Sequence, residues 1–280
     1  SYSAAHALYH PIFRNFLKRL GIYDFFLVDA ETGAIVYSVF KELDFATSLK
    51  NGSFSGTNFA RSFQKALSSG RRDAVAFADF ETYLPSYQAP ASFIAAPIHD
   101  GRDVRGVVVF QLPIDRMTAI IGETTGMGET GETYAVAADR LFRSQSRFTD
   151  ELGVGSTIIN PKIKVDTVAV RSALDEGETG TDTIRDYRDT DVLSSWRPVT
   201  IHRDARGGGK NVVWALISEI DQAEVLQPAR SLLQFALTIF GITTIGVLLV
   251  SANIANRFTR VARRQATLVD GIVENTHALA

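Results

Sequence analysis

A long uncharged stretch near the end of the chain limits what this sequence can fold into. Residues from Ser231 to Asn256 include no Asp, Glu, Lys or Arg, and they are rich in Leu, Ile, Val, Phe and Thr. A helix needs about 20 apolar residues to cross the hydrocarbon core of a bilayer. A core helix of a soluble protein rarely runs this long without a polar face. The sequence therefore predicts a transmembrane helix over residues 229–256.

Charges on either side of the stretch predict its orientation. Arg257 and three further arginines follow it, whereas Asp221 and Glu224 precede it. Excess positive charge marks the cytoplasmic side of a membrane helix. We therefore expect residues 257–280 in the cytoplasm and residues 1–228 outside it.

The composition of the outer part limits the compartments in which it can fold and the partners that it can bind. The chain has no cysteine, so an exported domain depends on packing rather than disulfides, which suits a bacterial periplasm. Residues 1–225 carry 24 Lys/Arg and 29 Asp/Glu, whereas a nucleic-acid partner would need a basic patch. We predict a protein of the bacterial inner membrane with no nucleic-acid partner. Because the sequence begins and ends inside helical patterns, we expect both natural ends to lie beyond it.

The outer part repeats one order of elements. "YDFFLVD" and "AIVYSVF" predict a hairpin, "GTNFARSFQKALSSG" a helix, and three strand patterns follow. The order recurs from "TYAVAAD" and "LFRSQS" through the helical "VDTVAVRSALDEG" to three more strands. Asp115 and Asp221, 106 residues apart, are expected to cap the helices that end the two copies. The repeat predicts an α+β fold with antiparallel sheets, in tandem units at residues 23–122 and 123–225.

Motifs typical of catalysis or cofactor binding lack their required context. "GMGETG" (126–131) precedes a strand pattern, whereas a dinucleotide fingerprint follows one. "GGGK" (207–210) lacks the upstream Gly and the Ser/Thr of a phosphate-binding loop, and we interpret it as a hairpin tip. His6 and His10 lie one helical turn apart, but zinc would need two further ligands. We predict no catalytic residue, no cofactor and no metal site, and hence no enzyme.

Five segments together resemble the double Cache sensor domains of bacterial transmembrane receptors, particularly those of methyl-accepting chemotaxis proteins. They are "YHPIFRNFL", "YDFFLVDAETGAIVYSVFKELDFATSL", "SYQAPASFIAAPI", "VFQLPIDRM" and "GMGETGETYAVAADRLFRSQSRF". The resemblance implies two PAS-like modules, membrane-distal at 23–122 and membrane-proximal at 123–225. It also implies a long N-terminal helix, of which residues 1–22 would be the end, descending from a first membrane span upstream.

The resemblance also covers the segment after the membrane span. Residues 257–280 are expected to form a HAMP-like or coiled-coil segment that leads to a missing output domain and its cytoplasmic signalling partners. A heptad seam suited to a parallel homodimer is formed by two sets of residues seven apart, namely Val261, Leu268 and Asn275, and Gln265, Ile272 and Leu279. A juxtamembrane helix that lies on the lipid surface is the alternative.

The resemblance also implies where a small-molecule ligand binds. In this family the site lies in the distal module, between its sheet and the segment that here reads "KELDFATSLKNGSFSGTNFARSF". The polar and aromatic residues that we expect to line it are Tyr37, Lys41, Asn58, Arg61, Asp79, Tyr83 and Tyr87. Arg61 or Lys41 would bind a carboxylate and Asp79 an amine. The chain lacks the Arg-x-Trp-Tyr motif of the amino-acid-binding members, so an amino-acid ligand is not supported.

Three functions remain open at this point. The first is extracytoplasmic small-molecule sensing with transmembrane signal transduction, as in a chemotaxis receptor. The second is the sensor region of a histidine kinase or a nucleotide or diguanylate cyclase, which the sequence downstream would distinguish. The third is a membrane-anchored periplasmic enzyme or binding protein without an output domain.

Overall fold

The computed structural model describes residues 2–203 and 211–277. The expected hairpin tip at 207–210 and the seam residue Leu279 lie outside this part, as do the side chains of Ile272 and Asn275. The chain divides into two compact units, Ser1–Glu224 and Val225–Ala280.

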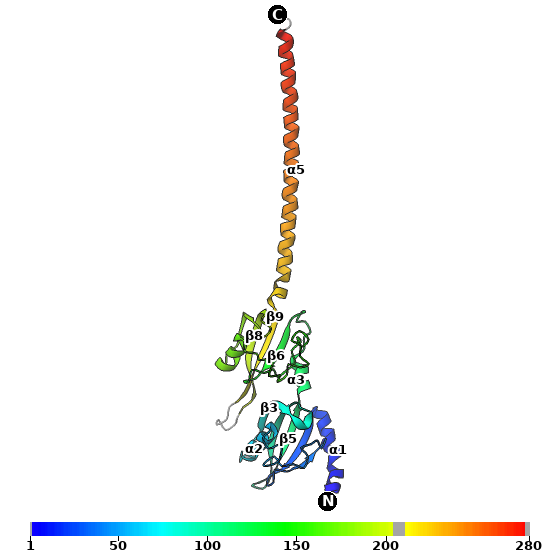
Figure 1. Ribbon diagram of the computed structural model, residues 1–280, viewed down its shortest axis with the longest axis vertical. Helices are drawn as coiled ribbons and strands as arrows, with labels where there is room; N and C mark the ends of the chain where they lie inside the picture. The colour runs from blue at the N-terminus through cyan, green and yellow to red at the C-terminus, as the bar shows by residue number, and fades with distance from the viewer. Residues whose placement is uncertain (1, 204–210, 278–280) are drawn as a thin grey trace. The chain divides into compact units, whose positions relative to one another are not determined.

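A five-stranded antiparallel sheet forms the first half of the larger unit (Figure 1), with strand order β2-β1-β5-β4-β3. Its strands are β1 (Asp24–Asp29), β2 (Ile35–Ser38), β3 (Ala76–Tyr83), β4 (Ala89–Asp100) and β5 (Asp103–Pro113). The β1–β2 turn forms because the Asp29 carboxylate accepts a hydrogen bond from the Thr32 backbone N–H at 2.7 Å. Gly33 then adopts a φ of +72°, which a side chain would strain.

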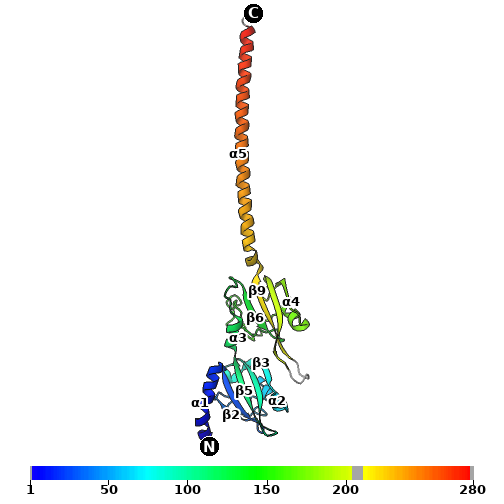
Figure 2. The ribbon, with the colours of Figure 1, turned by 180° about the vertical axis from the view of Figure 1, so that it is seen from behind.

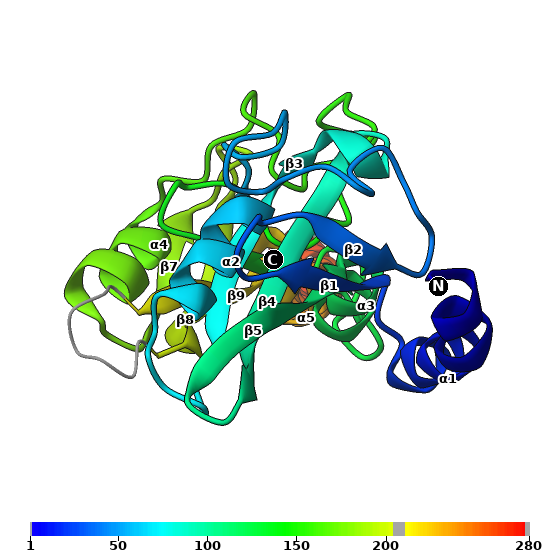
Figure 3. The same cartoon turned by 90° about the horizontal axis from the view of Figure 1, so that it is seen from below.

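Helices cover both faces of this sheet (Figure 3). Helix α2 (Asn58–Leu67) begins at Thr57, whose hydroxyl accepts the Ala60 N–H, and it packs on β3, β4 and β5. Because side chains alternate along a strand, Phe26 faces the α2 core whereas Phe25 faces helix α1 (Tyr2–Leu20). Each face of the sheet therefore packs against a helix.

A four-stranded antiparallel sheet, in the order β6-β9-β8-β7, forms the second half. Its strands are β6 (Glu132–Val136), β7 (Gly180–Arg185), β8 (Asp191–His202) and β9 (Val212–Asp221). Helix α4 (Val168–Arg171) and the π-helical turn Ser172–Glu176 pack on one face (Figure 2). Helix α3 (Ile114–Ile121) contacts β4 and β6, and it contributes to an apolar cluster with Phe80, Ala135 and Trp214. One compact unit thus contains both sheets.

The smaller unit belongs to helix α5 (Gln222–His277), which continues through Pro228. Within Gln222–Gln265 the mean hydropathy reaches 2.2 over an 18-residue window, and none of that window is buried. Large apolar side chains such as Leu232 and Phe240 are each 70% exposed. Helix α5 is the one helix among the described residues that is both long enough and apolar enough to cross a membrane.

Two local predictions are wrong. Asp115 does not cap α3, because the helix begins at Ile114 with Pro113 at the cap position and Asp115 inside the first turn. "LFRSQS" does not form a strand, because Phe142 makes only isolated bridges, to Val136 and to Ile158. The segment still lies beside β6, because the Arg143 N–H donates to the Ala135 carbonyl at 2.7 Å and the Ser144 hydroxyl accepts the Ala135 N–H at 3.1 Å.

Candidate functional site

Two of the expected site residues face α1 rather than α2. The Tyr37 hydroxyl lies 2.9 Å from Nδ1 of His10, and burial raises the pKa of Tyr37 to about 12. The Lys41 ammonium lies 2.7 Å from Nε2 of His6. Tyr37 and Lys41 are therefore on the opposite side of the five-stranded sheet from the α2 segment.

Three other expected residues, Asn58, Arg61 and Tyr87, do not meet at one place. The Asn58 amide donates to the Asp79 and Ala91 carbonyls at 2.9 and 2.7 Å, so it joins α2 to the sheet. Arg61 forms an ion pair with Glu81 in which both side chains are about half exposed. Tyr87 is 91% exposed. These groups do not converge on one ligand.

Asp79 is engaged by the second half of the unit. Its carboxylate accepts hydrogen bonds from Arg143 Nε at 3.1 Å and Trp214 Nε1 at 3.2 Å. The Arg143 side chain is only 3% exposed and also pairs with Asp139 at 2.7 Å. Burial raises the pKa of Asp79, and the Arg143 charge opposes that shift. Asp79 thus joins the two sheets.

Tyr83 is the expected residue that reaches a buried polar cluster. It is fully buried, and its hydroxyl donates to Asp44 Oδ2 at 2.6 Å. The other oxygen, Asp44 Oδ1, has no hydrogen-bond partner within the described part of the chain. Burial raises the pKa of Asp44, and the nearby charge of Glu42 raises it further. Tyr83 and Asp44 therefore leave one buried acceptor free.

Glu42, whose charge acts on Asp44, holds a second set of side chains. It accepts hydrogen bonds from the Tyr23 hydroxyl at 2.8 Å and from the Ser86 hydroxyl at 2.9 Å. The Gln111 amide nitrogen donates to Ser86 Oγ at 2.9 Å. We call the whole set the acidic network, which comprises Tyr23, Glu42, Asp44, Tyr83, Ser86 and Gln111.

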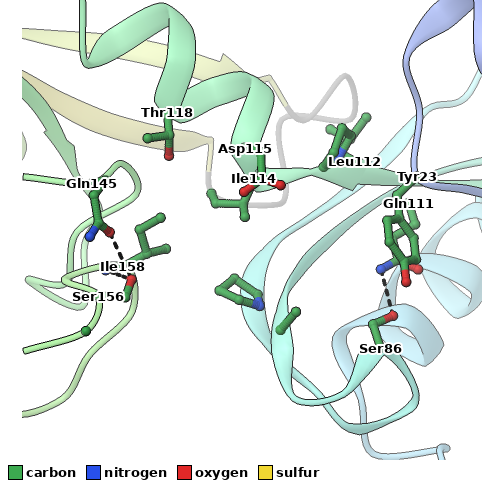
Figure 4. Close-up of a pocket in the computed structure, with 14 residues that line it drawn as sticks. Tyr23, Ser86, Gln111, Leu112, Ile114, Asp115, Thr118, Gln145, Ser156 and Ile158 are labelled. Atoms are coloured by element: carbon green, nitrogen blue, oxygen red, sulfur yellow. Dashed lines mark hydrogen bonds between the residues drawn. The ribbon is translucent and has the colours of Figure 1, made fainter.

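The acidic network borders a pocket of about 380 Å³, the junction pocket, shown in Figure 4. Tyr23, Ser86 and Gln111 form one wall. The other lining residues are Ala89, Pro90, Leu112, Pro113, Ile114, Asp115, Thr118, Gln145, Gly155, Ser156 and Ile158. They come from both halves of the unit, and Gln145 accepts a hydrogen bond from Ser156 at 2.9 Å. The pocket lies within the size range of sites for small molecules.

The charge and unused acceptors of the junction pocket define its chemistry. Asp115 supplies a carboxylate, and the part of the lining that the structure describes includes no Lys, Arg or His. Gln111 Oε1 and Thr118 Oγ1 are buried, and neither has a partner among residues 2–203 and 211–277. A carboxylate ligand would meet no opposite charge here. The pocket instead suits a neutral hydrogen-bonding molecule or an ammonium group.

Sequence reasoning missed most of this site, although a signal was present. Glu42 and Asp44 belong to the expected ligand segment, but the predicted lining took only Lys41, Asn58 and Arg61 from it. Gln111 interrupts the apolar strand "VVVFQLP", and a polar residue on a buried strand face indicates a specific partner. Tyr23 and Ser86 carry no comparable signal, because only the fold brings them to Glu42.

Comparisons with known proteins were made by sequence and by structure. No protein-family model and no curated protein matches the sequence. The periplasmic sensory domain of the Campylobacter jejuni chemoreceptor Tlp1 aligns with a TM-score of 0.54 and 13% identity, over 78% of each chain.

Two ligand-binding domains of Pseudomonas aeruginosa amino-acid chemoreceptors also align, each with 13% identity. PctB, in complex with L-Arg, has a TM-score of 0.47 and 75% coverage of both chains. PctC, in complex with GABA, has a TM-score of 0.45 and covers 71% of this chain and 74% of its own. The fold is assigned from the Tlp1 alignment. The two sheets and their helices therefore form the fold of a chemoreceptor periplasmic sensory domain, as expected for a double Cache sensor domain.

Proposed function

We propose that this chain is the small-molecule sensor of a bacterial transmembrane receptor, and that the receptor acts in chemotaxis. The observation that carries the proposal is the Tlp1-like fold followed directly in the chain by the exposed apolar helix α5. A binding role suits the junction pocket, which combines unpaired acceptors with apolar walls. Units 23–122 and 123–225 would then be the membrane-distal and membrane-proximal modules. The receptor would be a homodimer that signals through a cytoplasmic output domain.

The orientation of α5 in the membrane is tested by reporter fusions. An enzyme that is active only in the periplasm should be active when fused after residue 225 and silent when fused after residue 265. The physical reason is that the arginines from Arg257 onward hold the following residues in the cytoplasm. A cytoplasm-only reporter at the same two positions is the control. The reverse pattern would contradict the orientation.

The class of ligand is tested by thermal unfolding of the whole chain in nanodiscs. We expect small amines or neutral polar amides and polyols to raise the melting temperature, because a ligand that binds only the folded state stabilises it. Simple carboxylates without an amine should not, since the described lining of the pocket holds no basic side chain. Stabilisation by such carboxylates alone would contradict the proposed ligand class.

The location of the site is tested with variants of the pocket wall. For any compound that stabilises the chain, Gln111→Leu and Thr118→Leu should each weaken binding about tenfold, the equivalent of one hydrogen bond of ~1.4 kcal/mol. Isothermal titration calorimetry measures the change. Arg61→Ala is the matched control, because Arg61 is an expected ligand residue that lies outside the pocket. Lost binding in Arg61→Ala together with unchanged binding in both pocket variants would place the site beside α2 instead.

A further inference from the structure

Glu219 is a buried carboxyl group on the helix-covered face of the four-stranded sheet. Glu219 is only 3% exposed. It pairs across strands with Glu132 of β6 on one side and with Ser194 of β8 on the other. Because directly paired residues point to the same face, all three side chains share the buried face. Two carboxyl groups are thus opposite each other in the interior.

The two carboxyl groups differ in their hydrogen bonds. Glu132 accepts from the Tyr187 hydroxyl, from Ser146 Oγ at 2.9 Å and from the Arg147 N–H at 3.0 Å. Neither oxygen of Glu219 has a hydrogen-bond partner in the part of the chain that the structure describes. Burial raises the pKa of Glu132, and its donors oppose that shift by stabilising the charged form. The charged form of Glu219 has no comparable support.

Polar neighbours of Glu219 are close but not bonded to it. The Tyr134 hydroxyl and Ser194 Oγ are both buried, and both lack a partner among residues 2–203 and 211–277. Tyr134 is near enough to lower the pKa of Glu219, yet no hydrogen bond of acceptable geometry joins the two side chains. Glu219 therefore lies among buried polar groups whose hydrogen-bonding capacity is unused.

The charged groups around Glu219 do not neutralise it. Asp186 is buried and accepts from Arg188 Nε at 2.7 Å, and Arg188 also donates to Asp221 at 2.6 Å. Arg188 is thus engaged by other carboxylates, and Glu151 also lies 3.9 Å from it. Burial, with smaller contributions from the charges of Asp186 and Glu132, raises the pKa of Glu219 to about 8, and Tyr134 and Arg188 oppose this shift. An ionised Glu219 would add a further negative charge to this region.

The strand that carries Glu219 leads within three residues into α5. The first turn of α5 is held by the segment before β6, because the Glu224 carboxylate accepts the Glu129 and Thr130 N–H groups at 2.8 Å each. The Asp221 N–H donates to Thr130 Oγ1 at 3.1 Å. We call these contacts the α5 clasp. Repulsion between Glu132 and Glu219 would push apart β6 and β9, and the α5 clasp lies at the adjoining ends of these two strands.

We propose that the four-stranded sheet carries a second sensing site whose ligand is the proton, bound at Glu219 and read out through the α5 clasp. Loss of the proton to water at high pH leaves an unpaired buried carboxylate opposite Glu132. The β6–β9 pair is then weakened, and the clasp at the start of α5 loosens. Protonation restores the pair. This site is independent of the ligand in the junction pocket.

The proposal fixes the sign of a pH effect. The pKa of Glu219 is raised from 4.5 to about 8 on folding, so the folded chain binds more protons than the unfolded chain between these values. The stabilisation is fully present below pH 4.5 and is lost as pH rises through 8. Within this window, the titration of Glu219 alone should increase the unfolding equilibrium constant by up to about tenfold per pH unit.

The test compares the whole chain in nanodiscs with Glu219→Gln between pH 5 and pH 9. The amide has the same shape and does not titrate, so the variant should lack this share of the pH dependence. The quantity to measure at each pH is the ratio of the unfolding equilibrium constants of the wild type and Glu219→Gln. Asp24, with a pKa of about 7, titrates equally in both proteins, so its contribution cancels in this ratio. The solvent-exposed Glu178→Gln is the matched control and should follow the wild type.

Two further measurements separate sensing from a merely structural role. In Glu132→Gln the midpoint should move to lower pH, because a negative charge that raises the pKa of Glu219 is removed. Hydrogen exchange at residues 128–130 and 219–224 should be faster in wild type than in Glu219→Gln at pH 9, and equal at pH 5. Equal pH dependence in wild type and Glu219→Gln, or equal exchange at pH 9, would overturn the proposal.

Discussion

Asp79→Ala is expected to lower the free energy of unfolding by about 3 kcal/mol, because it leaves the buried Arg143 without one of its two carboxylate partners. The Trp214 N–H loses its acceptor at the same time. The lower end of the usual range applies, since Asp139 still pairs with Arg143 at 2.7 Å. Chemical denaturation of the whole chain in detergent measures the change.

The matched control is Glu81→Ala, two residues further along the same strand. The Arg61–Glu81 pair is about half exposed on both sides, so water screens it and its loss should cost less than about 1 kcal/mol. Equal losses in the two variants would show that the contact between Asp79 and Arg143 contributes little.

Phe59→Ala is expected to lower the free energy of unfolding by about 3–5 kcal/mol. Phe59 is fully buried in α2, and its ring lies 4.7 Å from the rings of both Phe26 and Phe93, centroid to centroid. Truncation leaves a cavity between α2 and the five-stranded sheet that rigid neighbours do not fill. Thermal and chemical unfolding of the whole chain give the value.

Phe40→Ala controls for the loss of a phenyl ring as such. Phe40 follows β2 and is 57% exposed, so its removal should change stability by less than about 0.5 kcal/mol. A loss in Phe59→Ala as small as that in Phe40→Ala would contradict the packing of α2. The comparison matters for function, because α2 and the segment before it enclose the buried Asp44–Tyr83 pair.

The long apolar helix and the class of fold could be read from the sequence because each depends on local patterns. An uncharged run of bilayer length predicts a helix whatever surrounds it, and α5 (Gln222–His277) is that helix. Alternating apolar residues and tight turns predict antiparallel strands, and two antiparallel sheets are present. Local chemistry was less reliable at the ends of elements, where Pro113 rather than Asp115 precedes α3.

The candidate site could not be read in the same way, because strand register decides which side chains meet. Tyr37 and Tyr83 are both tyrosines in strands of one sheet, yet Tyr37 contacts α1 and Tyr83 lies under α2. A shift of one residue reverses the face of every side chain in a strand, and the sequence pattern alone does not set the register.

Long-range contacts decided the rest. Gln111 meets Ser86 because β5 pairs with β4, which places the end of one strand beside the start of the other. Glu219 is opposite Glu132 because β9 lies next to β6, although 87 residues separate them in the sequence. The sequence shows that these residues are acidic or polar. Only the tertiary structure decided that they are buried, and burial in an apolar interior is what turns an ordinary carboxyl group into one that holds its proton near neutral pH.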